Sequence, residues 1–108
     1  MNNVQLIGRI STDLVLKEGQ KGAKYCPFTI AVKRARATQN LEQDTDFIPC
    51  IAFGKTAEVL CGYKKKGNMV GIVGELNINE IKTENGRKYF TEVTVREIDF
   101  ILNESKGS

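Results

Sequence analysis

The chain of 108 residues has 41% hydrophobic and 27% charged residues and a formal net charge of +3, which indicates one globular domain and excludes a disordered chain. It contains no histidine, and its three cysteines lack the spacing of metal ligands, so histidine-based catalysis is excluded and neither a metal nor a cofactor is expected. No signal pattern and no apolar run of membrane-spanning length is present, so we expect a cytoplasmic protein with reduced thiols and without a membrane or small-molecule partner.

Two strands are predicted at the start of the chain. Residues 4–10 form the first, in which Gly8 marks a bend or a close approach of two backbones. Residues 25–34 alternate between apolar and polar side chains and form the second, which is therefore half-buried. A polar loop follows over residues 33–45; it is basic at its start and acidic on its return.

The third strand, residues 46–53, has apolar side chains on both faces. One face carries Ile48, Cys50 and Ala52, and the other carries Phe47, Pro49, Ile51 and Phe53. A strand in a small domain normally has one face in solvent. The second apolar face is therefore either covered by protein or left open as a platform for flat ligands such as nucleic-acid bases.

The second half of the chain predicts one helix and two strands. The helix covers residues 55–63, a curved strand runs from residue 69 to about Lys82, and the last strand runs from residue 88 to about 102. Asn85 and Gly86 are typical of the two central residues of a hairpin turn. Five curved strands with a helix between the third and fourth predict an all-β protein with the five-stranded Greek-key barrel of the OB-fold. We expect one domain over residues 1–102 and a short polar end over residues 103–108.

Several segments in this order resemble the bacterial and phage-type single-stranded DNA-binding protein family. They are residues 4–9 (VQLIGR), 28–32 (FTIAV), 52–59 (AFGKTAEV), 63–67 (YKKKG), 74–76 (GEL) and 91–93 (TEV). The similarity extends over nearly the whole chain. Members from cells usually carry a long acidic-tipped tail, so the resemblance is to a tailless form, either natural or shortened.

The resemblance implies a non-enzymatic barrel that binds single-stranded DNA without strong sequence preference in replication, recombination or repair. It also implies a homotetramer built from dimers that pair through the first strand, here Asn3, Val4, Gln5, Leu6 and Ile7. Phe47 and Phe53 stand at positions where the family stacks bases on aromatic side chains. The DNA-binding protein would lie in a bacterial cytoplasm, on the nucleoid or as the product of a phage or plasmid.

Two positions depart from the family pattern, because Arg36 and Ile81 stand where many members carry an aromatic residue. If Asn85 and Gly86 form the turn, Ile81 lies opposite Phe90, which would restore an aromatic surface. Phosphate contacts are expected from basic side chains interleaved with these aromatics. They are Lys33, Arg34, Arg36, Lys55, Lys66, Lys82, Arg87 and Lys88.

Other interpretations stay open at this point. Phe47 and Phe53 could be core or subunit-interface residues, and Tyr25 and Tyr63 are expected to pack rather than stack. The protein could be a primosome-type accessory protein that acts through protein contacts, or a binder of single-stranded RNA. A metal or acid–base cluster at Glu42, Asp44 and Asp46 is less favoured than a solvated loop, and an enzyme is not expected.

Overall fold

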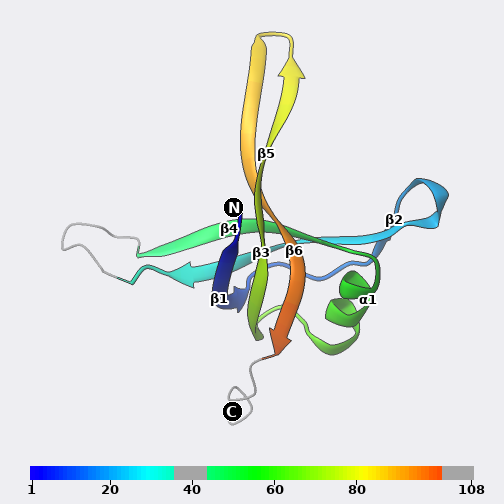
Figure 1. The fold of residues 1–108 in the computed structure, drawn as a ribbon, viewed down its shortest axis with the longest axis vertical. Coiled ribbons are helices and arrows are strands. Elements are labelled where there is room, and N and C mark those ends of the chain that lie inside the picture. The colour runs from blue at the N-terminus through cyan, green and yellow to red at the C-terminus, as the bar shows by residue number, and fades with distance from the viewer. Residues whose placement is uncertain (36–43, 101–108) are drawn as a thin grey trace.

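A computed structural model describes residues 1–35 and 44–100, and within these ranges the chain forms a curved β-sheet with one helix (Figure 1). The elements follow one another as β1 (Val4–Ile10), β2 (Lys17–Glu18), a 3-10 turn (Gln20–Gly22), β3 (Lys24–Lys33), β4 (Thr45–Phe53), α1 (Gly54–Tyr63), β5 (Met69–Thr83) and β6 (Gly86–Phe100). The predicted end of the domain and its polar tail lie outside the described residues.

The sheet closes into a barrel. Its strand order is β1-β5-β6-β4-β3-β2, and β1 pairs again with β3 through Arg9 with Ala31 and Ile10 with Ile30. All pairings are antiparallel except β4 with β6, which pair in parallel at Cys50 with Val93. The predicted all-β OB-fold with a helix between the third and fourth long strands is confirmed. The two-residue β2 is an addition that the sequence pattern did not show.

Two glycines allow the close approaches that the barrel needs. A Cβ on Gly8 would lie 2.5 Å from the carbonyl oxygen of Ala31, at the seam where β1 meets β3. A Cβ on Gly74 would overlap the carbonyl oxygen of Thr94, where the β5–β6 register shifts between Val73 and Gly74. Neither site has room for a side chain, so the close backbone approach predicted at Gly8 is confirmed, and Gly74 allows a second one in the strand that was predicted to be curved.

The inner face of the barrel holds the hydrophobic core, and α1 covers one end of it through Ala57 and Leu60. The buried residues are Ile10, Cys26, Phe28, Ile30, Cys50, Ala52, Ala57, Leu60, Val70, Ile72, Val93 and Val95. Burial raises the pKa of the Cys26 and Cys50 thiols to about 12, so both stay protonated and unreactive at neutral pH.

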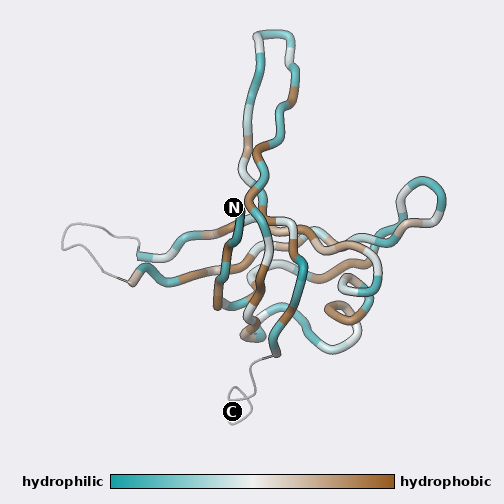
Figure 2. The backbone as a smooth tube through the Cα atoms, viewed as in Figure 1, coloured by the Kyte–Doolittle hydropathy of each residue, from teal (hydrophilic) through white to brown (hydrophobic). Residues whose placement is uncertain are grey.

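Two hairpin arms extend from the barrel in different directions (Figure 1). One is the β3–β4 hairpin, and the other is formed by the outer halves of β5 and β6. Figure 2 shows that the tip of the β5–β6 arm is hydrophilic, whereas apolar residues are concentrated in the barrel strands. The side chain of Asn2 adds a rung to the β1–β5 ladder at the root of this arm, because its amide donates to the Leu76 carbonyl and accepts from the Leu76 N–H, each at 2.8 Å.

The turn of the β5–β6 arm differs from the prediction. Thr83 pairs with Gly86, so Glu84 and Asn85 are the turn residues rather than Asn85 and Gly86. Gly86 has a φ of 129°, whereas Asn85 does not take a positive φ, so Gly86 is the residue that begins the return strand. The prediction that Ile81 pairs with Phe90 is therefore wrong.

Candidate nucleic-acid interface

Strand pairing places six of the predicted DNA-binding residues on one face of the sheet, opposite the core. Residues directly across a ladder point to the same side. Phe47 lies opposite Ala31, Phe53 opposite Tyr25, and Ile51 beside Thr94. By this rule, the six predicted residues that share this face are Lys33, Phe47, Phe53, Ile81, Lys88 and Phe90. We call it the outer face.

The apolar members of the outer face are open to solvent. Phe47 is 58% exposed, Phe53 51%, Ile81 50% and Phe90 40%. The alternative that Phe47 and Phe53 are core residues is therefore excluded in the single chain. On β4 they are separated by six residues, a distance of about 20 Å at the usual strand rise of about 3.3 Å per residue. They offer two separate contact points along one strand.

The β5–β6 arm continues the outer face beyond the barrel. Phe90 pairs with Asn79 and Ile81 pairs with Lys88, so Ile81 and Phe90 are diagonal neighbours on one side of the arm. Both are exposed, and Lys88, the partner of Ile81 across the ladder, is exposed as well. The arm thus carries an apolar pair beside a cation, although in a different register from the predicted one.

Three of the predicted cations belong to the opposite side. Arg34 follows β3 and donates three hydrogen bonds to Asp46, from Nε to Oδ1 at 3.2 Å, from Nε to Oδ2 at 3.1 Å and from Nη2 to Oδ1 at 2.9 Å. These bonds hold the pKa of Asp46 below its usual range and raise that of Arg34. Arg87 lies across from Lys82, on the side away from Phe90, and its Nε is 3.0 Å from the Glu80 carboxylate. The charges of Arg34 and Arg87 are already partly balanced. Contact of Arg34, Lys82 and Arg87 with DNA stays a prediction.

The two remaining lysines flank the helix. Lys55 is exposed at the start of α1, two residues after Phe53. Lys66 is exposed in the turn before β5, which is tied to β1 by a hydrogen bond from the Gly67 N–H to the Ile10 carbonyl at 2.8 Å. Of these two lysines, only Lys55 is close in sequence to a residue of the outer face, namely Phe53. Arg36 and Glu42 lie outside the described residues.

An aromatic residue expected to pack is found on the outer face. Tyr25 lies directly opposite Phe53, with ring centroids 6.5 Å apart and ring planes inclined by 37°. Tyr63, the other tyrosine expected to pack, lies at the end of α1 and is 76% exposed. The position of Tyr25 could have been read from the alternation of the second strand, in which its neighbour Cys26 faces the core.

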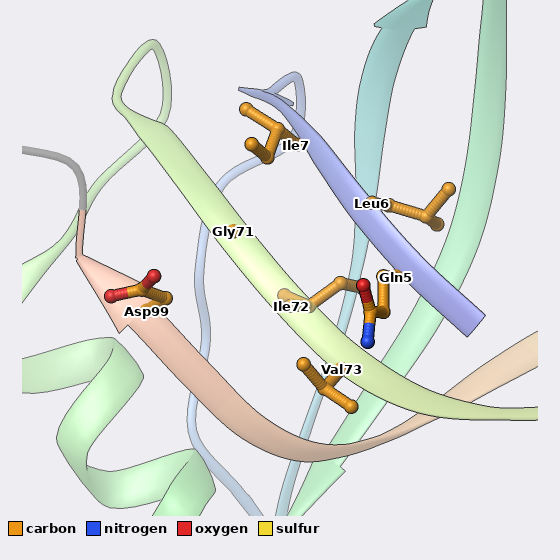
Figure 3. Close-up of a pocket in the computed structure, with 7 residues that line it drawn as sticks. All are labelled: Gln5, Leu6, Ile7, Gly71, Ile72, Val73 and Asp99. Carbon is orange, nitrogen blue, oxygen red and sulfur yellow. The ribbon is translucent and has the colours of Figure 1, made fainter. Parts of the chain in front are cut away.

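The predicted assembly strand has an open edge. Within the described residues, β1 pairs with β5 from Val4 to Arg9 but meets β3 only at its last two residues. Ile7 is 59% exposed, whereas Val4 and Leu6 pack against the core. Asn3 accepts a hydrogen bond from Arg96 at 2.7 Å. Figure 3 shows a shallow depression on this side, lined by Gln5, Leu6, Ile7, Gly71, Ile72, Val73 and Asp99.

The described residues contain no cluster of three metal-ligating side chains. No helix in the described ranges is long and apolar enough to cross a membrane. The outer face combines exposed apolar side chains with cations, which is the chemistry of a binding surface.

Comparisons with known proteins place the chain among related sequences. The model of the single-strand binding protein family matches residues 1–101. The chain is 42% identical to single-stranded DNA-binding protein 1 of Clostridium acetobutylicum over 103 residues, 94% of each chain. It is 37% identical to the single-stranded DNA-binding protein of Bacillus cereus over 108 residues, which are 99% of this chain and 64% of the relative. Single-stranded DNA-binding protein 2 of Listeria monocytogenes is 35% identical over 102 residues, 94% of this chain and 64% of its own.

Proposed function

Because the chain belongs to the single-strand binding protein family, we propose that it binds single-stranded DNA with little regard to base sequence and without a catalytic step. The observation that carries this proposal is the pair of exposed phenylalanines, Phe47 and Phe53, on a strand whose other face forms the core. Large apolar side chains in such positions mark an interaction surface.

The physical mechanism combines stacking and charge neutralisation. A base stacked on an aromatic side chain contributes about 1–3 kcal/mol whichever base it is, because every base has a π-face. Phe47, Phe53 and Phe90 supply such surfaces, while Lys33, Lys55 and Lys88 lie beside them as partners for phosphates. Each phosphate contact releases counterions, so binding should weaken steeply with salt.

We further propose that the protein coats and protects single-stranded DNA during replication, recombination or repair in a bacterial cytoplasm. The open edge of β1 supports assembly, because an unpaired strand edge offers hydrogen-bonding groups to a second copy. Pairing of two β1 edges would give a dimer, and two dimers would give the tetramer. The exposed side chain of Ile7 would be covered in such an assembly.

The experiment is a titration of labelled oligo-dT of about 35 nucleotides, long enough for at least two OB-fold sites, followed by anisotropy at low and moderate salt. RNA of the same length and a DNA duplex are the controls. The proposal predicts tight, salt-sensitive binding to oligo-dT and weaker binding to both controls. Equal affinity for the RNA would favour an RNA binder. No binding at low salt would refute the proposal and favour an accessory protein that acts through protein contacts.

A further inference from the structure

Tyr25 and Phe53 form a two-ring cluster on the outer face, whereas Phe47 is a single ring among the residues that the structure describes. Phe47 lies opposite Ala31, and Phe53 lies opposite Tyr25. The ring centroids of the pair are 6.5 Å apart, and the planes are inclined by 37°. The two rings therefore do not stack face to face on each other, and Phe53 remains 51% exposed.

The ring of Tyr25 lies beside the turn that follows β2. A Cβ added to Gly19 would lie 3.6 Å from Cε1 of Tyr25, so the turn that follows β2 runs next to the tyrosine ring with space between them for a small group. The Gly19 N–H donates to the Ala23 carbonyl at 2.7 Å, which closes this turn. Tyr25 is thus a half-buried ring at the surface beside a closed turn, and it is not a core residue.

Cations stand at both ends of the pair. Lys17 on β2 lies directly opposite Tyr25, so the row across β2, β3 and β4 reads Lys17, Tyr25, Phe53. Lys55 follows Phe53 by two residues, and both lysines are exposed. The ion pair of this turn joins Lys24 and Glu18, which belong to the opposite side of the ladder. Rings flanked by cations are the pattern that single-stranded nucleic acid requires.

We propose that Tyr25 and Phe53 together form one base-stacking subsite, in which a base on the Phe53 ring also contacts Tyr25 and Lys17 contacts a neighbouring phosphate. This inference rests on the proposed function and adds to it a site that is distinct from Phe47. The two-ring subsite offers a base more contact area than the single ring of Phe47.

Tyrosine fluorescence gives a direct test, because the chain has three tyrosines and no tryptophan. The double variant Tyr63→Phe/Tyr89→Phe leaves Tyr25 as the sole tyrosine. Saturation of this variant with oligo-dT should quench its tyrosine emission, because a base in contact with the ring provides a path for loss of the excited state. Binding of oligo-dT, measured by anisotropy, without a change in emission would overturn the subsite.

Affinity measurements on Tyr25 separate stacking from packing. Tyr25→Phe should bind oligo-dT as tightly as the parent, because the ring is kept. Tyr25→Leu should bind about five- to tenfold more weakly, the loss expected when part of one stacking contact is removed. Tyr89→Leu, on the other side of the arm from Phe90, is the matched control. Unchanged affinity of Tyr25→Leu would overturn the proposal.

Lys17→Gln tests the phosphate contact. The slope of log affinity against log salt should become less negative by about 0.7, the value for one phosphate of a single strand. An unchanged slope would remove Lys17 from the subsite. If the parent protein does not bind oligo-dT at all, the proposed function itself fails. If the parent binds while Tyr25 stays unquenched, only the subsite fails.

Discussion

The variant Phe47→Ala should lose affinity for single-stranded DNA while the protein stays folded. Phe47 is 58% exposed, so of a side-chain area of roughly 200 Å² only about 80 Å² leaves water on folding. At about 25 cal/mol per Å², the lost burial amounts to at most about 2 kcal/mol, less than the 5–15 kcal/mol that small domains typically have. In contrast, loss of a stacked base costs about 1–3 kcal/mol of binding, or about 5- to 150-fold in Kd.

The assay is oligo-dT anisotropy at fixed salt, with a thermal melt of each variant to show that it is folded. Tyr63→Ala is the control, since Tyr63 is even more exposed, at 76%, but lies at the end of α1 and does not belong to the outer face. We expect Phe47→Ala to bind weakly and Tyr63→Ala to bind normally. A folded Phe47→Ala protein with the parent's Kd would refute the assignment of Phe47 as a stacking residue.

Three further predictions follow from faces and close contacts. Lys33→Ala should make the slope of log affinity against log salt less negative by about 0.7. Arg34→Ala should change this slope less, because Arg34 lies on the opposite side of the sheet and is bonded to Asp46. Equal slopes for the two variants would contradict the assignment of Lys33 and Arg34 to opposite faces. Gly8→Ala should cost about 1–3 kcal/mol and lower Tm by at least about 4 °C, since its Cβ would lie 2.5 Å from a carbonyl oxygen. Gly62→Ala has nothing within 4 Å and should not lower Tm; similar melting of both variants would argue against a steric origin. Ile7→Arg should give a folded protein of lower molar mass than the parent, measured by light scattering after size exclusion. A molar mass equal to that of the parent would exclude the β1 surface as the interface between copies of the chain.

The long strands and the exposure of Phe47 and Phe53 could be predicted because alternation along a strand depends only on local geometry. Residues 46–53 carry apolar side chains on both faces, and only one face has a core to fill. The same reasoning applied to Tyr25 would have placed it on the outer face with Phe53. Its partner across the ladder, however, depends on register, which the pattern alone does not specify.

The turn of the β5–β6 arm illustrates what the sequence did not determine. An Asn-Gly pair is compatible with two hairpin registers, one with both residues in the turn and one with glycine in the first position of the return strand. The structure has the second, which moves the partner of Ile81 from Phe90 to Lys88. The sequence likewise did not show that Lys33 and Arg34 have different environments. Adjacent residues in a strand point to opposite sides, and the hydrogen bonds from Arg34 to Asp46 form only on folding.

The extra rung made by Asn2 has a consequence for the N-terminus. Its amide imitates a peptide group and covers the backbone of Leu76, at the place where β5 leaves the barrel. Exposed strand edges attract other strands, and proteins commonly block them. Removal of the first two residues would expose the backbone N–H and carbonyl of Leu76. The unpaired edge of β5 at the root of the arm would then be longer and more prone to pair with another strand. A fusion tag is therefore better joined away from the N-terminus, so that the hydrogen bonds between Asn2 and Leu76 are kept.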